Sequence, residues 1–311
     1  MALDEATAGF LTQLAESGSK PLNELTPEEA RSFGSVWREL TGPGPEMAAV
    51  RDEVLTAADG GQFRVRVLVP AGEIRALVIY YHGGGWVLGD LDEFETLGRT
   101  LAARLSAAVV LVDYRLAPEH RYPAAAEDAW TALEWASGRM TEIAGGLVPL
   151  IVMGDSAGGN LSAVVAQRAC AAGGPQIHTQ VLIYPVTDAD LDNETYSDPA
   201  NQLMLNRDGM IWFWDHYAPD PADRLRPDAS PIRAADLSGL APAIVLTAEH
   251  DVLRQEGEAY AVRLADAGVP VTSRRFGGQM HGFFTMVNIL PGSAEAITYI
   301  ADELSPRLAA S

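Results

Sequence analysis

Continuous apolar runs alternate with helical patterns from about residue 50 to the end of the chain, and this alternation constrains the fold more than any other feature. Runs such as ALVIYY and AVVLVDY are typical of parallel strands that are buried on both faces. The helices between such strands must cover both faces of the sheet. The sequence therefore predicts an α/β fold with a mostly parallel, eight-stranded sheet. The expected strands are 51–57, 63–69, 76–81, 108–114, 149–154, 180–185, 243–248 and 271–276.

The first two expected strands differ from the rest because apolar and polar residues alternate along them. Such alternation indicates an antiparallel pair at one edge of the sheet. The helical patterns that fill the gaps between the later strands are 93–105, 124–137, 157–172, 254–267 and 294–307.

Two segments do not follow the alternation and predict a helical cap. Residues 1–45 hold two helical patterns, and the second begins at Thr26 with the letters TPEE, where a threonine cap, a proline and first-turn acids agree. Residues from about 188–238 form an insertion rich in aromatic side chains. Open α/β sheets bind ligands at the carboxyl ends of their strands, so we expect both segments to cover that end of a single domain, 1–311.

The acidic composition excludes several classes of partner. Lys plus Arg number 22 and Asp plus Glu number 42, which gives a net charge of −20. Such a chain repels nucleic-acid phosphates and anionic membranes. Its single cysteine, Cys170, cannot form an internal disulfide, and no apolar run reaches the roughly 18 residues that cross a bilayer. Because the first residues also lack the basic flank of an export signal, we expect a cytoplasmic protein.

The sharpest motif is GDSAGG at residues 154–159, which follows an apolar strand and precedes a helical pattern. This context is the one that a G-x-S-x-G nucleophile turn requires. Ser156 would stand on a tight, strained turn, and side chains at Gly154 and Gly158 would collide with neighbouring elements. We therefore predict that Ser156 is a nucleophile, and the alternative is a simple strand-to-helix turn.

A second motif, HGGGW at residues 82–86, follows the strand ALVIYY. Consecutive glycines let the backbone turn its amides into a cavity, where Gly83 and Gly84 could bind an oxyanion together with the amide of Ala157. A dinucleotide loop would need a third glycine where Leu88 stands. His82 precedes the glycines, so we expect it to hold the loop rather than to act as a base.

A serine nucleophile needs a base to remove its proton and a carboxylate to orient that base. The candidate bases are His250 and His281, and the candidate acids are Glu249 and Asp251. Asp251 follows the strand AIVLTAE, and His281 follows the last expected strand. The order serine, aspartate, histidine is that of α/β-hydrolases. His250 is adjacent to Asp251 in the chain, so their side chains would diverge, which favours His281.

Together these motifs make the chain resemble the bacterial hormone-sensitive-lipase family of esterases, in its GDSAG branch. The resemblance covers most of the chain, and one departure is Val252, where the family usually has proline after the catalytic aspartate. The matching motifs are HGGGW (82–86), DYRLAPE (113–119), YPA (122–124), GDSAGG (154–159), YP (184–185), DASP (228–231), EHDVLR (249–254) and HGF (281–283).

The resemblance implies an α/β-hydrolase fold with a helical cap and a catalytic triad of Ser156, His281 and Asp251. It also implies hydrolysis of small-molecule esters with short to medium acyl chains, through an acyl-enzyme. The implied oxyanion donors are the amides of Gly83, Gly84 and Ala157.

No metal or cofactor is expected. The acidic turn at residues 188–192 resembles the start of a calcium loop, but Asn193 and Pro199 stand where that loop needs glycine and a bidentate glutamate. The sequence also lacks the H-E-x-x-H pattern of zinc hydrolases.

Aromatic side chains predict an apolar substrate pocket, with Trp86, Trp212 and Trp214 as candidate binding residues. Two other functions stay open: acyl transfer or amide cleavage by the same triad, and a non-catalytic small-molecule receptor on the same fold. The presence of His281 favours an enzyme over a receptor. The last strand would form a sheet edge, which would allow a homodimer.

Overall fold

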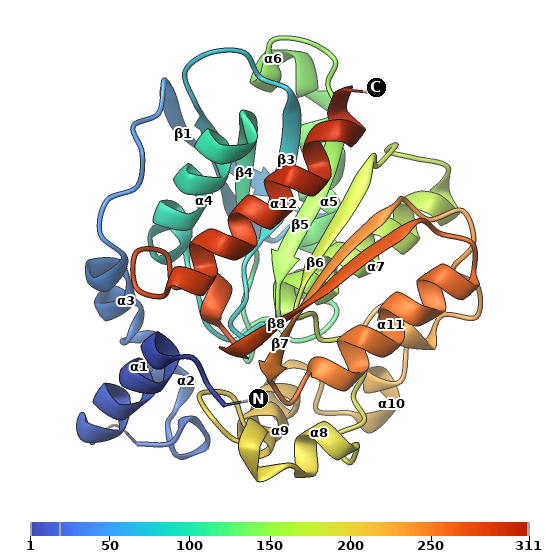
Figure 1. The fold of residues 1–311 in the computed structure, drawn as a ribbon. Coiled ribbons are helices and arrows are strands. Elements are labelled where there is room, and N and C mark those ends of the chain that lie inside the picture. Colours follow the sequence, from blue (N-terminus) through green and yellow to red (C-terminus); the bar gives the residue numbers. More distant parts are fainter. Residues whose placement is uncertain (1, 19, 310–311) are drawn as a thin grey trace.

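The computed structural model describes residues 2–18 and 20–309, which form an eight-stranded sheet flanked by helices (Figure 1). The strands are β1 (Ala49–Thr56), β2 (Gln62–Val69), β3 (Ala76–Tyr81), β4 (Ala107–Asp113), β5 (Leu150–Asp155), β6 (Thr179–Ile183), β7 (Ala243–His250) and β8 (Val271–Met280). They are ordered β1-β2-β4-β3-β5-β6-β7-β8. β2 is antiparallel to β1 and to β4, and the other neighbours are parallel. The predicted architecture and antiparallel edge pair are confirmed.

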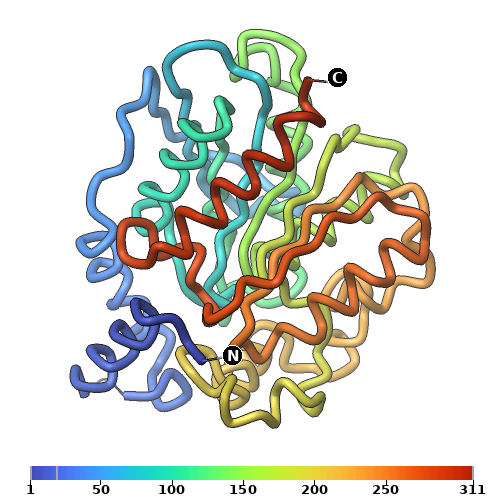
Figure 2. Tube along the Cα trace, viewed as in Figure 1, coloured from blue at the N-terminus to red at the C-terminus, as the bar shows by residue number. Residues whose placement is uncertain are grey.

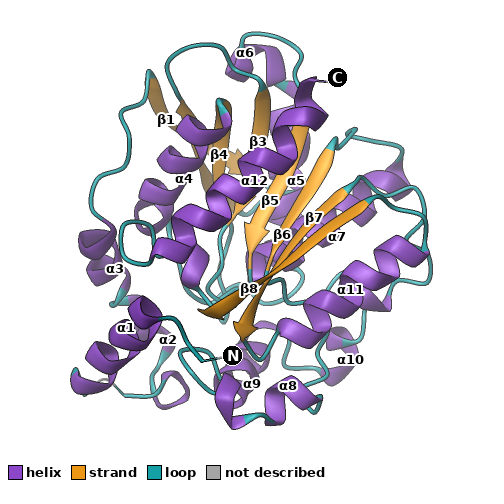
Figure 3. Ribbon diagram, in the orientation of Figure 1, coloured by secondary structure: helices purple, strands orange, loops and turns teal. Residues whose placement is uncertain are grey.

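Helices cover both faces of this sheet (Figure 3). The long ones are α4 (Leu91–Leu105), α5 (Ala124–Gly138), α7 (Ala157–Ala172), α11 (Arg254–Asp266) and α12 (Pro291–Ala309), and the short α6 (Met140–Ala144) follows α5. Leu97 of α4 and Ile300 of α12 share a buried cluster with Val78, whereas Leu133 of α5 shares another with Ile79. Successive β3 residues therefore pack against different helix layers, as a strand buried on both sides requires. Within the described ranges, no helix has the length and apolarity to cross a membrane.

Shorter helices gather beyond the ends of β7 and β8 to which the arrows point (Figure 1). They come from the two segments expected to form a cap, and we call residues 5–41 and 194–224 the cap segments. Figure 2 shows the two segments side by side, and Trp212 Nε1 donates a hydrogen bond to Leu25 O at 3.2 Å across them. The helices there are α1 (Glu5–Glu16), α2 (Pro27–Arg31), α8 (Glu194–Ser197), α9 (Arg207–Tyr217) and α10 (Pro221–Arg224). The first segment also contains α3 (Gly34–Thr41), which lies beside α4.

The start of α2 follows the sequence signal at Thr26. The Thr26 hydroxyl accepts the Glu29 N–H, and the Glu29 carboxylate accepts the Thr26 N–H, with Pro27 in the first turn. This reciprocal capping satisfies two amide groups that the helix itself cannot pair. The predicted helix start is confirmed.

Arg31, at the end of α2, joins the first cap segment to the loops around the glycine motif. Its Nε donates to Val87 O at 2.8 Å, and Nη2 donates to Ala117 O at 2.7 Å. The guanidinium also binds both carboxylate oxygens of Glu119 at 2.8 Å. This two-point geometry fixes the orientation of the arginine as well as its position.

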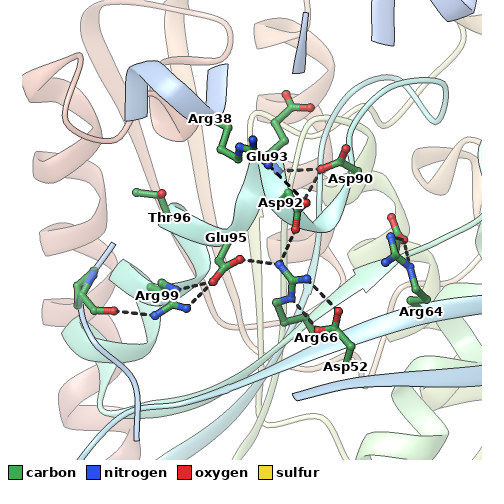
Figure 4. A network of polar contacts seen from close by, with 12 residues as sticks. Arg38, Asp52, Arg64, Arg66, Asp90, Asp92, Glu93, Glu95, Thr96 and Arg99 are labelled. Carbon is green, nitrogen blue, oxygen red and sulfur yellow. Dashed lines mark hydrogen bonds and ion pairs between the residues drawn. The ribbon is translucent and has the colours of Figure 1, made fainter. Parts of the chain in front are cut away.

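A second arginine network fixes the beginning of α4 against the edge of the sheet (Figure 4). Arg66 of β2 binds Asp52 of β1 at 2.7 Å, and its Nη1 contacts Asp92 at 2.8 Å and Glu95 at 2.5 Å. Arg38 of α3 lies 3.6 Å from the same Asp92. One largely buried cation thereby connects the edge strands with the helix that follows the glycine motif.

Candidate active site

Ser156 occupies a single-residue turn between β5 and α7. Its backbone has φ 55° and ψ −117°, a left-handed conformation that a residue other than glycine adopts at a cost of about 1–3 kcal/mol. A β-carbon added at Gly158 would lie 1.8 Å from Tyr81 O, and one at Gly154 would lie 2.3 Å from Gly158 O. The two glycines are therefore required for steric reasons, as the motif predicts.

The structure brings Ser156, His281 and Asp251 into one chain of polar contacts. His281 Nε2 lies 3.0 Å from Ser156 Oγ, and its Nδ1 lies 2.8 Å from Asp251 Oδ2. The second carboxylate oxygen, Asp251 Oδ1, accepts the Leu253 N–H at 2.9 Å. All three side chains are buried, since Ser156 is 6%, His281 8% and Asp251 0% exposed. The carboxylate thus faces one imidazole nitrogen while the other nitrogen faces the serine hydroxyl.

The other candidate groups lie elsewhere. His250 Nε2 is 4.0 Å from the Glu249 carboxylate, and the Glu249 carboxylate accepts the Gly278 N–H at 2.8 Å. His82 stacks between Phe94 and Tyr114, with ring centroids 4.9 Å and 4.3 Å away. Burial lowers the pKa of His82, which favours the neutral imidazole. These contacts agree with the interpretation of His82 as a loop-holding residue.

Of the three amides expected to bind an oxyanion, one has a partner in the protein. The Gly83 N–H donates to Asp155 Oδ1 at 2.9 Å. In the part of the chain that the structure describes, the N–H groups of Gly84 and Ala157 have no such acceptor. Ala157 is the first residue of α7, whose N-terminal amides favour negative charge. The structure thus leaves two of the expected donors free and engages the third.

Trp86 and Trp214, two of the residues expected to bind substrate, pack against other aromatic side chains. Both side chains are 0% exposed. Trp86 stacks on Tyr217 with ring centroids 4.2 Å apart and lies 4.9 Å from Trp214. These three rings pack against one another where α9 meets the glycine loop. Trp212 is half-buried and bonds Leu25 O as described above.

Two other cap side chains, which were not among the candidate site residues, contact the loops beside Ser156 and His281. A β-carbon added at Gly85 would lie 2.1 Å from the Phe213 ring. One added at Gly282, the residue after His281, would lie 2.4 Å from Met204 Cε. Phe213 and Met204 therefore pack directly on the α-carbons of these glycines.

A profile of the α/β hydrolase fold family matches residues 78–285, which is well over half of the sequence. The chain belongs to the α/β-hydrolase family. This hydrolase is 42% identical over 266 residues to carboxylesterase NlhH of Mycobacterium tuberculosis, with 83% of each chain covered. It is 36% identical to an ethyl acetate hydrolase of Pseudomonas putida, covering 99% of this chain and 100% of that one.

A solved structure agrees with these relatives. The crystal structure of a thermostable esterase from Pseudomonas putida ECU1011 superposes on the hydrolase with a TM-score of 0.92 and 37% identity, covering 99% of this chain and 98% of that one. The predicted membership of the hormone-sensitive-lipase family is confirmed by the profile and the relatives together.

The acidic turn of the hydrolase is held by arginines. Asp188 lies 2.6 Å from Arg233, and Asp192 lies 2.7 Å from Arg207. Among the residues that the structure describes, no group of three or more histidine, cysteine or acidic side chains is arranged to hold a metal ion.

Asp155, the last residue of β5, is a buried carboxylate with a raised pKa. Burial raises its pKa to about 6 from the ordinary 3.8, while hydrogen bonds from Tyr80 and Gly83 oppose the shift. A carboxyl whose pKa is higher in the folded than in the unfolded chain binds more protons when folded. Its contribution to the free energy of unfolding therefore rises as the pH falls from above about 6 to about 4.

We expect Asp155→Asn to remove this contribution, since the amide does not titrate. Between about pH 7 and pH 4 the wild-type hydrolase should gain about 2.5 kcal/mol in its free energy of unfolding relative to the variant, most of the roughly 3 kcal/mol that a shift of about two pKa units supplies. Urea unfolding of both proteins at several pH values measures the difference. If the two profiles ran parallel, the pKa of Asp155 would not be raised.

Proposed function

We propose that this α/β-hydrolase hydrolyses carboxylic esters of small acyl groups through an acyl-enzyme on Ser156. The observation that carries the proposal is the continuous contact from Ser156 Oγ through His281 to Asp251, at 3.0 Å and 2.8 Å. Relatives that are named carboxylesterase and ethyl acetate hydrolase support the same reaction.

In the first half of the reaction, Ser156 Oγ attacks the ester carbonyl carbon while His281 Nε2 takes the hydroxyl proton. The carbonyl oxygen becomes an oxyanion, which the free amides of Gly84 and Ala157 stabilise. When the tetrahedral intermediate collapses, the carbon–alkoxy bond breaks and His281 protonates the leaving alcohol. The acyl group stays on Ser156.

In the second half, water replaces the alcohol. His281 removes a proton from water as its oxygen attacks the acyl carbon, and the same proton returns to Ser156 Oγ when the acid leaves. Asp251 supports both halves, because its carboxylate accepts the Nδ1 proton and stabilises the imidazolium that forms. After a turnover, Ser156, His281 and Asp251 are back in their starting protonation states.

We infer that the surroundings of the serine favour a small acyl group. Ser156 is 6% exposed, and Met204 and Phe213 already occupy the space above Gly282 and Gly85. Esters with short to medium acyl chains are therefore the proposed substrates, bound beneath the cap segments.

We expect a fluorophosphonate probe to label Ser156 and p-nitrophenyl esters to be cleaved fastest when the acyl chain is short. Peptide mass spectrometry locates the label, and initial rates across a series from acetate to laurate give the preference. A label on another residue, or a rate that rises steadily to the longest chain, would contradict the proposal. Stoichiometric labelling without turnover would favour a receptor, and alkyl ester products in added alcohol would favour acyl transfer.

A single domain, a cytoplasmic location and a homodimer complete the proposal. The acidic composition supports the location, since a charge of −20 repels anionic membranes. Strand β8 lies at the edge of the sheet, and sheet edges can pair with another chain, which supports a homodimer. Sedimentation velocity would measure the oligomeric state.

A further inference from the structure

The Asp155 carboxylate, adjacent to the nucleophile, has no part in the proton transfers proposed above. It is 4% exposed, and its Oδ1 accepts the Tyr80 hydroxyl at 2.7 Å and the Gly83 N–H at 2.9 Å. Its Oδ2 lies against the same glycine, because a β-carbon on Gly83 would come within 2.3 Å of it. The carboxylate is therefore seated on the first glycine of the loop.

The same peptide is held from its carbonyl side by Tyr114. The Tyr114 hydroxyl donates to His82 O at 2.8 Å and lies 3.3 Å from Gly83 O. Its ring also stacks on the His82 imidazole. The His82–Gly83 peptide thus has its oxygen bound by Tyr114 and its nitrogen bound by Asp155, so its plane cannot rotate without breaking a buried hydrogen bond.

Because the His82–Gly83 peptide is held in place, the orientation of the next peptide, which carries the Gly84 N–H, is also restricted. Gly84 follows with φ +97°, and its N–H is one of the two expected oxyanion donors that have no acceptor among the described residues. An oxyanion donor works because it is oriented before the charge develops. A turn that contains three successive glycines has little stiffness of its own, so the orientation must come from side chains that bind the loop.

We propose that Asp155 is a positioning residue that orients the glycine loop by accepting the Gly83 N–H, so that amides other than that of Gly83, those of Gly84 and Ala157 among them, bind the oxyanion. The inference rests on the proposed ester hydrolysis. It assigns a task to the residue between Gly154 and Ser156, and it removes Gly83 from the donors that the family resemblance implies.

The test compares Asp155→Ala with Asp155→Asn. Alanine removes the acceptor, and we expect kcat for p-nitrophenyl acetate to fall about a hundredfold, the typical loss of one oxyanion donor, with KM changed less than about threefold. Asparagine keeps an oxygen acceptor in the same place, so its kcat should stay within about tenfold of wild type. Asp128→Asn is the matched control, since Asp128 is a fully buried carboxylate that binds Arg115 instead.

A transition-state analogue separates positioning from general destabilisation. Ser156 Oγ adds to the carbonyl carbon of an alkyl trifluoromethyl ketone. His281 takes the hydroxyl proton, and the ketone oxygen becomes an oxyanion. Its inhibition constant should rise in Asp155→Ala by the same factor as kcat falls, and should stay near wild type in Asp128→Asn even if that variant melts earlier. Unchanged kcat and inhibition constant in Asp155→Ala, or an equal loss in Asp155→Asn, would overturn the proposal.

A crystal structure of the wild-type ketone adduct tests the donors without any substitution, should Asp155→Ala fail to fold. We expect the oxyanion within hydrogen-bonding distance of the Gly84 and Ala157 nitrogens, with the Gly83 N–H still on Asp155. A Gly83 nitrogen that points at the ketone oxygen would refute the inference. If the wild-type protein showed neither turnover nor ketone binding, the proposed function would fail instead.

Discussion

Ser156→Ala is expected to lower kcat for p-nitrophenyl acetate about a millionfold, the loss seen when the nucleophile of a well-studied serine hydrolase is removed. The hydroxyl is the only group deleted, and alanine keeps the β-carbon that Ser156 already carries at φ 55°. The strain of the turn therefore stays the same, and the variant should fold normally. Stopped assays at high enzyme concentration and a thermal melt measure the two quantities.

Ser162→Ala is the matched control for this variant. Ser162 lies on α7, the helix that follows Ser156, and is buried, and its hydroxyl donates to Gly158 O at 2.9 Å. Its removal should leave kcat within about threefold of wild type. Turnover by a folded Ser156→Ala protein at more than about a hundredth of the wild-type rate would show that another group is the nucleophile.

Asp251→Asn is expected to lower kcat about ten-thousandfold, for a reason that the local hydrogen bonds make specific. The Leu253 N–H donates to Oδ1 at 2.9 Å, so the oxygen of the substituted amide would take that position. The NH2 group of the amide would then face His281 Nδ1 in place of Oδ2. An NH2 donor forces Nδ1 to accept and places the ring proton on Nε2, which can no longer take the proton of Ser156.

Steady-state kinetics of Asp251→Asn measure this effect, with Asp113→Asn as the control. Asp113 also ends a strand but binds Arg64 at 2.9 Å, and its strand β4 is separated from β7 by β3, β5 and β6. Its neutralisation should leave kcat within about threefold of wild type. A loss of less than about tenfold in Asp251→Asn would mean that the carboxylate does not set the imidazole tautomer.

Most of the sheet could be predicted because buried parallel strands are apolar at every position, and the exception is β8. The sequence analysis ends this strand at Phe276, because two glycines follow it. The strand in fact continues to Met280, with Gly278 at φ +71° and a register shift opposite Ala248 and His250. Glycine marks both a strand end and a bulge, and only pairing with β7 distinguishes them.

The aromatic residues of the insertion recur at helical spacing. The prediction that they form the walls of a pocket did not take this spacing into account. The buried residues of α9 include Met210, Phe213, Trp214 and Tyr217, which recur at helical spacing, whereas Trp212 lies off that face. This period predicts that Trp214 packs inward. That Phe213 would meet Gly85 could not be predicted, because residues so far apart in the sequence meet only through the fold.

The contact among Ser156, His281 and Asp251 could be expected from the sequence because each residue follows a strand of the same sheet. The use of the Gly83 amide could not, since the motif HGGGW shows that the loop is pliable but not which amides point outward. An aspartate at position 155, next to a nucleophile, was the available signal. It lies inside a motif that the nucleophile and its glycines already account for.

The strained backbone at Ser156 has a consequence for redesign of the hydrolase. The shape of this turn depends on Gly154 and Gly158, which leave no room for a β-carbon. It does not depend on the hydroxyl oxygen of Ser156. A thiol could stand in its place without disturbing the chain, whereas one methyl group at Gly158 would press the helix away from β3. The oxygen at position 156 can thus be replaced by sulfur, whereas Gly154 and Gly158 cannot be replaced by larger residues.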